Sequence, residues 1–274
     1  MLKNQEERLE YLIDELCLES SACKHLEEMR SEPEKLLRSL MNIRTSKPIS
    51  EKFLKIQDRY LKCAAEEKGI VTLSEIPTIQ EFYNSNIEFA DRISLWKGDI
   101  TRLHVDAIVN AANSQMLGCF IPCHKCIDNA IHSAAGIQLR DACHQYMTEK
   151  RKEDPTYEEP TGSAVITEGF NLPSKYVIHT VGPIVSWHLT EDLKQDLMHC
   201  YESCLKVALE NNIKSIAFCC ISTGEFHFPS DEAAIIAIKS VQSFLEKDPD
   251  KIERIIFNVF KDQDLEIYKG LLCK

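Results

Sequence analysis

A cluster of soft metal ligands lies near the middle of the chain. Cys119, Cys123, His124 and Cys126 fall within eight residues, and Asp128 follows two residues later. Thiolates favour zinc over magnesium or calcium, and a catalytic zinc site has three protein ligands and one open position. A closed structural site usually draws two pairs of ligands from two segments, and this chain has no second such pair nearby. The spacing therefore favours an open site, with plain surface thiols as the alternative.

Three of these side chains can converge on one ion. Cys119, His124 and Cys126 meet if the loop folds back on itself, and Pro122 favours such a bend. Cys123 adjoins His124 and would need a very tight geometry. Asp128 stands at the expected start of a helix, where a carboxylate often serves as the N-cap. Beside a metal, the same carboxylate can instead act on a proton of water or of a substrate hydroxyl.

The pattern from about residue 90 onward predicts the elements that hold this loop. Short β-branched runs alternate with helical periods, which indicates an α/β layered domain with strands covered on both faces. Strands are expected at 93–97, 107–111, 163–168, 176–181, 215–221 and 254–260. Helices are expected at 128–149, 189–211, 231–247 and 262–272.

Polar and glycine-containing segments follow several of these strands. Ligands of open α/β sheets bind beyond the carboxyl ends of the strands. Asp99, after Gly98, can accept a hydrogen bond from an exocyclic amine, and the loop at 222–224 can direct free N–H groups at an anion. Each segment alone is also typical of a turn with a helix cap, for which Ser230 or Asp231 is available. His179, within an apolar strand, is expected to be a hydrogen-bonded core histidine rather than a catalytic base.

The first 90 residues are expected to form helices. Leu9 to Leu16 include an apolar stripe at helical spacing, Pro33 marks a helix start, and a third helix runs from Ser50 to Lys68 with Gly69 as its stop. No catalytic cluster lies here, so this segment is interpreted as a helical cap on the main domain or a docking surface for a protein partner.

The composition of the chain limits the classes of partner that it can bind. The chain has 274 residues, 44% hydrophobic content and a formal net charge of −11. One large domain or two small ones are expected, and the negative charge argues against non-specific binding to nucleic acid or anionic membranes. We find no secretion signal and no apolar run long enough for a transmembrane helix, so a cytoplasmic protein is expected. Its 12 cysteines are then interpreted as thiols or metal ligands rather than disulfides.

Four motifs together resemble a macrodomain, the α/β fold that binds ADP-ribose. The resemblance covers residues 90–274 and implies a three-layer α/β/α macrodomain at 91–274, with a mixed, roughly six-stranded sheet, preceded by a small helical extension at 1–90. The motifs, in family order, are Gly98-Asp99-Ile100-Thr101, Val109-Asn110-Ala111-Ala112-Asn113-Ser114, Ile178-His179-Thr180-Val181-Gly182-Pro183, and Ile221-Ser222-Thr223-Gly224 with Phe228-Pro229 downstream.

The chain departs from the common family pattern at one segment, and there it resembles the zinc-dependent branch of the family. Macrodomain hydrolases commonly have a glycine-rich run where this chain has the cysteine-containing segment 118–128. The zinc-dependent branch also has a helical N-terminal extension. The resemblance implies one Zn²⁺ per chain, held by Cys119, His124 and Cys126, with Cys123 not a ligand. A second departure is His227, where many macrodomains have glycine; a bulkier residue there would narrow the pyrophosphate channel.

The resemblance also implies roles for further residues. Asp99 takes the adenine amine, with the Ile100 N–H alongside, and Asn113 and Asp128 hold the distal ribose and serve as catalytic residues. The backbone N–H groups that cradle the diphosphate are those of Ser222, Thr223, Gly224, Glu225 and Phe226.

The implied activity is hydrolysis of mono-ADP-ribose from protein side chains, with an ester to an acidic residue as the expected linkage. A lipoyl-carrier protein of the glycine-cleavage type and a sirtuin-like ADP-ribosyltransferase are implied partners. The main alternative is a reader that binds ADP-ribosylated proteins without cleaving them. A phosphoesterase acting on ADP-ribose phosphates and a zinc-stabilised scaffold are further alternatives. The Cys-His-Cys loop and Asp128 favour the enzyme, because neither is needed to hold adenine or pyrophosphate.

Overall fold

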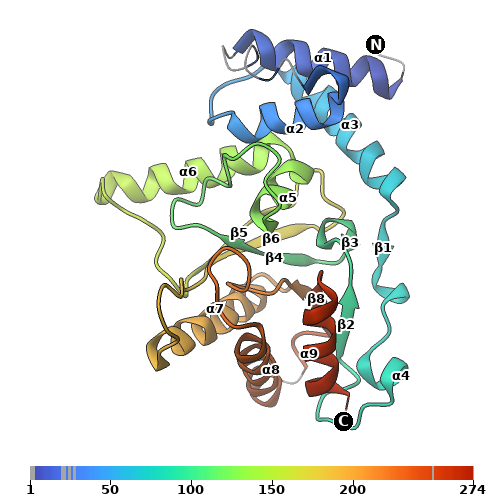
Figure 1. Cartoon of the computed structure of the whole chain (residues 1–274), viewed down its shortest axis with the longest axis vertical. Helices are drawn as coiled ribbons and strands as arrows, with labels where there is room; N and C mark the ends of the chain where they lie inside the picture. The colour runs from blue at the N-terminus through green and yellow to red at the C-terminus, as the bar shows by residue number, and fades with distance from the viewer. Residues whose placement is uncertain (1–3, 20–22, 24–25, 27–28, 249, 274) are drawn as a thin grey trace.

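A six-stranded mixed sheet forms the centre of the protein (Figure 1). The computed structural model describes residues 4–19, 23, 26, 29–248 and 250–273. The strand order is β2-β8-β7-β4-β6-β5, in which β5 alone runs antiparallel to its neighbour β6. The strands are β2 (Ile93–Lys97), β4 (Ala107–Ala112), β5 (Ala164–Glu168), β6 (Tyr176–Val181), β7 (Ser215–Phe218) and β8 (Arg254–Val259).

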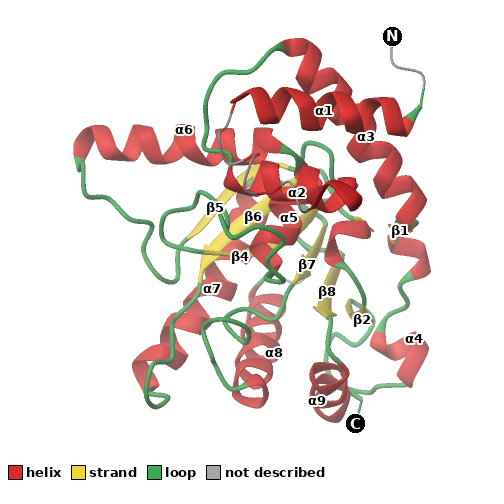
Figure 2. Cartoon of the chain, turned by 45° about the horizontal axis from the view of Figure 1, so that its top comes forward, coloured by secondary structure: helices red, strands yellow, loops and turns green. Residues whose placement is uncertain are grey.

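Helices cover both faces of this sheet. Helices α5 and α6 lie on the face toward the N-terminal helices, and α7, α8 and α9 lie on the opposite face (Figures 1 and 2). The predicted three-layer α/β/α fold with a mixed, six-stranded sheet is therefore confirmed. The helices are α5 (Ile127–Ala135), α6 (Ile137–Glu153), α7 (Glu191–Glu210), α8 (Ser230–Lys247) and α9 (Asp262–Leu272).

One predicted helix is two. The expected helix at 128–149 breaks at Gly136, whose φ of +93° lies in a region that side-chain-bearing residues rarely adopt. A Cβ there would come within 2.7 Å of Gln57 Nε2 and 2.9 Å of Asn171 Nδ2. The strand expected at 215–221 also ends earlier, at Phe218, and leaves the next residues free to form a loop.

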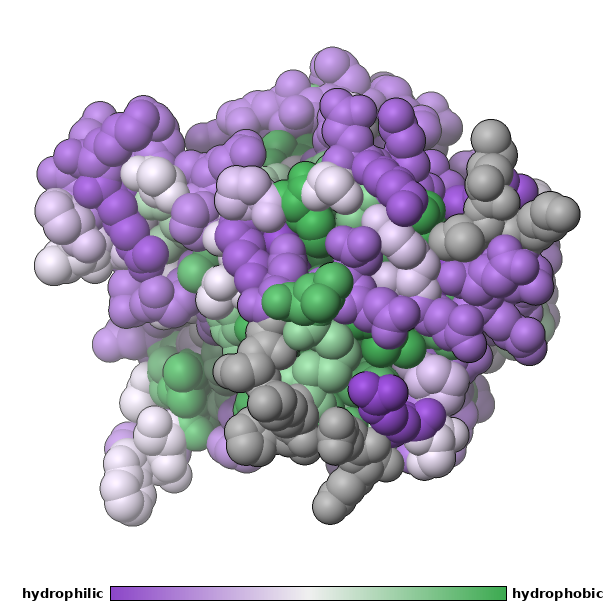
Figure 3. All heavy atoms as spheres, turned by 90° about the horizontal axis from the view of Figure 1, so that it is seen from above, coloured by the Kyte–Doolittle hydropathy of each residue, from purple (hydrophilic) through white to green (hydrophobic). Residues whose placement is uncertain are grey.

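The N-terminal extension forms its own apolar cluster. Helices α1 (Gln5–Glu19), α2 (Pro33–Ile43) and α3 (Glu51–Lys68) match the expected helices. Ser50 caps α3 by accepting the Phe53 N–H at 3.1 Å, and Gly69 ends it with a φ of 82°. The cluster includes Ile137 of α6, so the extension packs directly onto the helix layer of the sheet. Seen from the side of the extension, the surface is mostly hydrophilic with small hydrophobic patches (Figure 3).

Residues between α3 and β2 pack with the main domain. Strand β1 (Val71–Thr72) pairs with β3 (Leu103–His104), and two short helices follow, η2 (Leu73–Glu75) and α4 (Ile79–Tyr83). The sequence did not predict these short elements. Ile76 and Ile79 are buried in the main core rather than in the cluster of the extension. The division of the chain near residue 90 stays a prediction.

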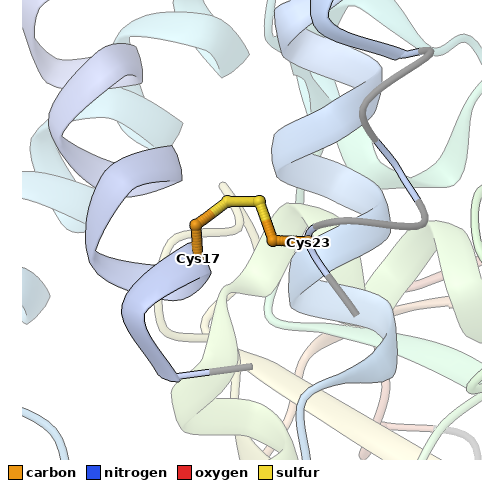
Figure 4. The surroundings of a disulfide bond; sticks show 2 residues. All are labelled: Cys17 and Cys23. Atoms are coloured by element: carbon orange, nitrogen blue, oxygen red, sulfur yellow. A yellow bond between two sulfur atoms is a disulfide. The ribbon is translucent and has the colours of Figure 1, made fainter. Parts of the chain in front are cut away.

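One cysteine pair contradicts the expectation that all cysteines are thiols or metal ligands. Cys17 and Cys23 form a disulfide beside the end of α1 (Figure 4). They lie six positions apart in the sequence, and their Cα atoms are 5.1 Å apart, within the range that a disulfide spans. The other ten cysteines are free thiols. Among the described residues, no helix is both long and apolar enough to cross a lipid bilayer.

Candidate functional site

The loop between β4 and α5 brings three metal-binding groups together. Ligand atoms of Cys119, His124 and Cys126 all lie within 4.8 Å of one another, and Cys119 Sγ is 3.6 Å from His124 Nδ1. All three side chains are half-buried. Cys123 is directed elsewhere, with its Sγ 3.3 Å from Ser39 Oγ of α2. The geometry thus forms a possible metal site with the three residues expected, and leaves Cys123 outside it.

The chemistry of these donors suits a thiophilic cation. Burial raises the pKa of Cys126 to about 12, although a hydrogen bond from the Asn129 N–H to its Sγ at 3.4 Å opposes that rise. A thiol of this kind stays protonated at neutral pH unless a bound cation stabilises the thiolate. Cys126 is also the N-cap of α5, so the prediction of Asp128 as a possible cap is wrong.

Asp128 lies in the first turn of α5 and is buried, with 5% of its surface exposed. Its Oδ1 accepts a hydrogen bond of 2.8 Å from Asn110 Nδ2 and lies 3.5 Å from His132 Nε2. Burial raises the pKa of Asp128 to about 6, against the opposing effect of the Asn110 hydrogen bond. A carboxylate with a pKa near neutrality is suited to exchange protons with a bound substrate or water.

A buried polar network supports Asp128 from the sheet. Register pairs Asn110 of β4 with His179 of β6, and Asn110 Nδ2 lies 3.1 Å from His179 Nδ1. Thr167 Oγ1 lies 3.0 Å from His179 Nε2. Burial lowers the pKa of His179 to about 4 and keeps it neutral. His179 is therefore the hydrogen-bonded core histidine that the sequence predicted.

Asn110 and His132 are the neighbours of Asp128 that sequence reasoning missed. Asn110 stands inside the Asn-Ala-Ala-Asn motif, but the family resemblance indicates Asn113 as the asparagine that acts with Asp128. His132 lies one turn after Asp128 on α5, which is the available signal. His132, Cys143 and His179 also lie close enough to hold an ion, but both ring nitrogens of His179 already have partners.

Asn113 shapes the start of the loop at 118–126, which contains the three possible metal ligands and is hereafter called the metal loop. Its Nδ2 donates to the Gly118 carbonyl at 3.3 Å, and its Oδ1 accepts the Gln115 N–H at 3.1 Å. Within the part of the chain that the structure describes, no hydrogen bond joins Asn113 to Asp128. Gly118 has a φ of +77°, and a Cβ there would approach the His132 ring to 2.9 Å. The expected role of Asn113 at the distal ribose stays a prediction.

The loop after β7 presents unpaired N–H groups. In the described residues, the backbone N–H groups of Gly224, Glu225 and Phe226 make no hydrogen bond. Such groups on one loop are suited to bind an anion. Ser222, with a φ of 63°, fits closely against Gly182, where an added Cβ would lie 2.1 Å from its Oγ.

Two details of this loop correct or refine the sequence reasoning. The N-cap of α8 is Pro229, which has no capping side chain, so the prediction of a cap by Ser230 or Asp231 is wrong. His227 has a φ of 55°, which explains why glycine would suit this position. Its side chain is exposed.

The metal loop and the loop after β7 meet at their side chains. His124 Nε2 lies 3.7 Å from Glu225 Oε1, on the side of the ring opposite to Cys119. A carboxylate beside the outer nitrogen of a metal-binding histidine orients the ring and selects its tautomer. The two loops therefore approach each other at this contact.

Asp99 lies at the end of β2 and caps the short helix η3 (Ile100–Arg102). Its Oδ1 accepts hydrogen bonds from Thr101 N at 3.0 Å and from Thr101 Oγ1 at 2.7 Å, and its Oδ2 lies 3.4 Å from Lys68 Nζ. Burial alone would raise the pKa of Asp99, but these hydrogen bonds and the lysine lower it overall. Asp99 is thus an ionised acceptor, and its Oδ2 accepts fewer hydrogen bonds than its Oδ1.

Comparisons with known proteins identify the family of this chain. Residues 109–237 match the Macro domain. The chain is 47% identical over 270 residues to a protein-ADP-ribose hydrolase of Treponema medium, covering 98% of this chain and 99% of the relative. It is 42% identical to a protein-ADP-ribose hydrolase of Staphylococcus aureus (strain MRSA252), covering 98% and 96%.

Solved structures show the same fold. The crystal structure of a Trypanosoma brucei macrodomain in complex with ADP-ribose is 28% identical to this chain, with a TM-score of 0.65. The match covers 85% of this chain and 94% of that one. Given these similarities and the site described above, the chain belongs to the macro domain family.

Proposed function

We propose that this protein hydrolyses mono-ADP-ribose from modified protein side chains. The observation that carries the proposal is the buried Asp128, held by Asn110 next to the Cys-His-Cys loop. Two relatives at 47% and 42% identity are named protein-ADP-ribose hydrolases, which supports the same class of reaction. Neither Asp128 nor the cysteine loop is needed merely to hold adenine or diphosphate.

The substrate is proposed to lie along three segments. Asp99 would accept a hydrogen bond from the adenine amine, with the Ile100 N–H beside it. The unpaired N–H groups of Gly224, Glu225 and Phe226 would bind the diphosphate, as their lack of internal partners supports. The distal ribose would then lie between Asn113 and Asp128, at the start of the metal loop and the start of α5.

The proposed reaction is hydrolysis of an ester between the distal ribose and an acidic side chain. Water supplies a hydroxyl group to one side of the broken bond and a proton to the other. Asp128 would take a proton from water or from a ribose hydroxyl and return it to the leaving group, because its pKa of about 6 allows both steps near neutrality. Asn110 would hold the carboxylate in place through its 2.8 Å hydrogen bond.

We also propose one Zn²⁺ per chain, held by Cys119, His124 and Cys126. The half-buried thiols and imidazole within 4.8 Å of one another support this assignment. When bound there, zinc would supply a Lewis acid beside the distal ribose. The carboxylate of Glu225, 3.7 Å from the outer nitrogen of His124, would help to orient the ring for binding.

A reader function is the second candidate, because the adenine and diphosphate contacts would serve it equally well.

The proposed acceptor proteins include a lipoyl-carrier protein of the glycine-cleavage type, modified by a sirtuin-like ADP-ribosyltransferase. Family resemblance alone supports these partners.

The proposal can be tested with the purified protein and a protein mono-ADP-ribosylated at acidic residues. Zinc content is measured, and release of ADP-ribose is followed with and without a chelator, and again after zinc is returned. About one zinc per chain, with release that chelation stops and zinc restores, is the expected result. Tight ADP-ribose binding without release under any condition would instead support the reader.

A further inference from the structure

The N-terminal extension touches the metal loop through one helix. Helix α2 lies beside α5 and the preceding loop, and three of its polar side chains, Arg38, Ser39 and Asn42, contact that loop or α5. Ser39 and Asn42 are buried, and Arg38 is half-buried. The expected function assigns no role to these side chains.

Arg38 contacts the loop at a ligand residue. Its Nη2 donates to the main-chain carbonyl of His124 at 3.1 Å. Its Nε and Nη2 also donate to Asn129 Oδ1, at 3.1 and 2.6 Å. The planar guanidinium thus joins α2 to both the loop and α5, a geometry that lysine cannot reproduce.

Asn129 passes this contact on to the rest of the loop. Its Nδ2 donates to the carbonyl of Ile121 at 2.9 Å, and its main-chain N–H donates to Cys126 Sγ at 3.4 Å. Arg38 is therefore linked to two proposed ligands. It contacts the main-chain carbonyl of His124 directly, and through Asn129 it is linked to Cys126 Sγ and to the carbonyl of Ile121.

Asn42 makes a second, separate contact. Its Oδ1 accepts the main-chain N–H of Cys123 at 3.0 Å, and its Nδ2 donates to Ser133 Oγ of α5 at 3.0 Å. Cys123 has a φ of 50°, which costs energy for a residue with a side chain. The contact with Asn42 stabilises this turn, directly before His124.

The segment from 118 to 126 has no helix or strand of its own. Ordering an irregular loop costs conformational entropy, and metal binding is weaker when the ion must supply that ordering. We propose that α2 pre-orders the metal loop, with Arg38 and Asn42 as positioning residues for the ligands. This inference rests on the proposed metal binding and gives the N-terminal extension a role in it.

The test compares metal binding by the full-length variants Arg38→Ala, Arg38→Lys and Asn42→Ala with that of the wild type. Arg59→Ala is the matched control, because Arg59 is an exposed arginine of the same extension that makes no hydrogen bond or ion pair with any described residue. Zinc affinity is measured by competition with a chromogenic chelator. Cobalt substitution reports ligand geometry through the thiolate-to-cobalt absorption band. Unfolding midpoints without metal show whether each variant is folded.

We expect Arg38→Ala and Asn42→Ala each to weaken zinc binding about tenfold, as loss of an outer contact to metal ligands typically does. Arg38→Lys should lie between Arg38→Ala and wild type, and Arg59→Ala should match wild type. If Arg38→Ala unfolds, a weaker affinity in Arg38→Lys or Asn42→Ala at an unchanged midpoint still supports the proposal. Wild-type zinc affinity and cobalt spectra in these variants would overturn it. A wild-type chain that binds no zinc would instead contradict the metal centre, and with it this role of α2.

Discussion

At the scale of single residues, the site depends on a carboxylate buried among neutral partners. Asp128 has Asn110 and His132 as its neighbours, and burial lowers the pKa of His132 well below its usual value. Neither neighbour compensates a full negative charge, and the positive charge of Arg140 lowers the pKa of Asp128 by less than burial raises it. At neutral pH the buried Asp128 is ionised, and burial of this charge lowers the stability of the folded protein. Such a cost is a common feature of catalytic groups.

The variant Asp128→Asn should stabilise the metal-free protein at pH 7. The pKa of Asp128 is raised from 3.8 to about 6 in the folded state, so the unfolded state ionises first and the cost is complete above that value. The asparagine can keep the contact with Asn110. Denaturant unfolding should show a gain of about 1–3 kcal/mol at pH 7, falling toward zero as the pH falls to about 4. A loss of stability at pH 7, or a gain independent of pH, would contradict this account.

The variant Asp99→Asn tests the proposed adenine contact. It removes the charge of the acceptor and should weaken ADP-ribose binding about tenfold, since hydrogen bonds to charged groups contribute about 1.5–3 kcal/mol. Calorimetric titration with ADP-ribose measures the effect. Asp91→Asn, at an exposed aspartate just before β2, serves as the control. Equal affinity in the two variants would remove Asp99 from the binding site.

The types of these residues could be predicted from the sequence more readily than their partners. The spacing of Cys119, His124 and Cys126 within one loop indicated a shared ion, because neighbours in sequence stay neighbours in space. The contact of Asn110 with Asp128 joins a strand to a helix across the loop, and no local pattern encodes it. The sequence motif therefore pointed to Asn113, one of two asparagines in the same run, while Asn110 is the one that contacts Asp128.

At the scale of elements, the strands that hold the site were predicted well because they are apolar on both faces. Five of six predicted strands match within one residue at each end, and β2 and β6 match fully. The break between α5 and α6 was missed, because one glycine within an amphipathic pattern does not itself end a helix. Its reason is tertiary: side chains from α3 and from the segment after β5 occupy the space beside Gly136.

Gln57 of α3 fills part of that space and caps α6. It is fully buried, its Oε1 accepts the Ile137 N–H at 3.2 Å, and its Nε2 donates to Gln138 Oε1 at 2.6 Å. Gln57→Ala should lower the free energy of unfolding by about 1–3 kcal/mol, because the first N–H of α6 would be buried without a partner. Denaturant unfolding measures this. The exposed Gln80→Ala should change stability by less than about 0.5 kcal/mol; an equal effect in both variants would argue against the cap.

At the scale of the whole molecule, the extension and the sheet domain pack directly against each other and are not joined by a linker alone. Ile137 of α6 belongs to the apolar cluster of the extension, and Arg140 Nη1 donates to the Met41 carbonyl of α2 at 2.8 Å. The sequence predicted helices here, and the packing confirms the interpretation of this segment as a helical cap on the main domain. The docking contacts themselves could not be predicted, because they depend on buried polar groups of both parts. The cysteine pair at 17 and 23 was missed for a related reason, since its pairing depends on how α1 ends.

This shared packing predicts a single unfolding transition for the full chain. The calorimetric and van't Hoff enthalpies of the metal-free protein should agree, as they do for a cooperative unit. Scanning calorimetry provides both values. Two resolved transitions would show that the extension unfolds independently, which would also weaken the argument that α2 pre-orders the metal loop.

The central claim is that Asp128 makes this macro domain protein a hydrolase rather than a reader. Single-turnover release of ADP-ribose from a mono-ADP-ribosylated protein tests it most directly, with wild type, Asp128→Ala and an exposed control, Asp192→Ala, compared at saturating enzyme. Asp128→Ala is predicted to bind ADP-ribose within about threefold of wild type but to release it about 10²–10⁴-fold more slowly. Asp192→Ala is predicted to match wild type. Near-normal release by Asp128→Ala, or no release by wild type despite tight binding, would contradict the account.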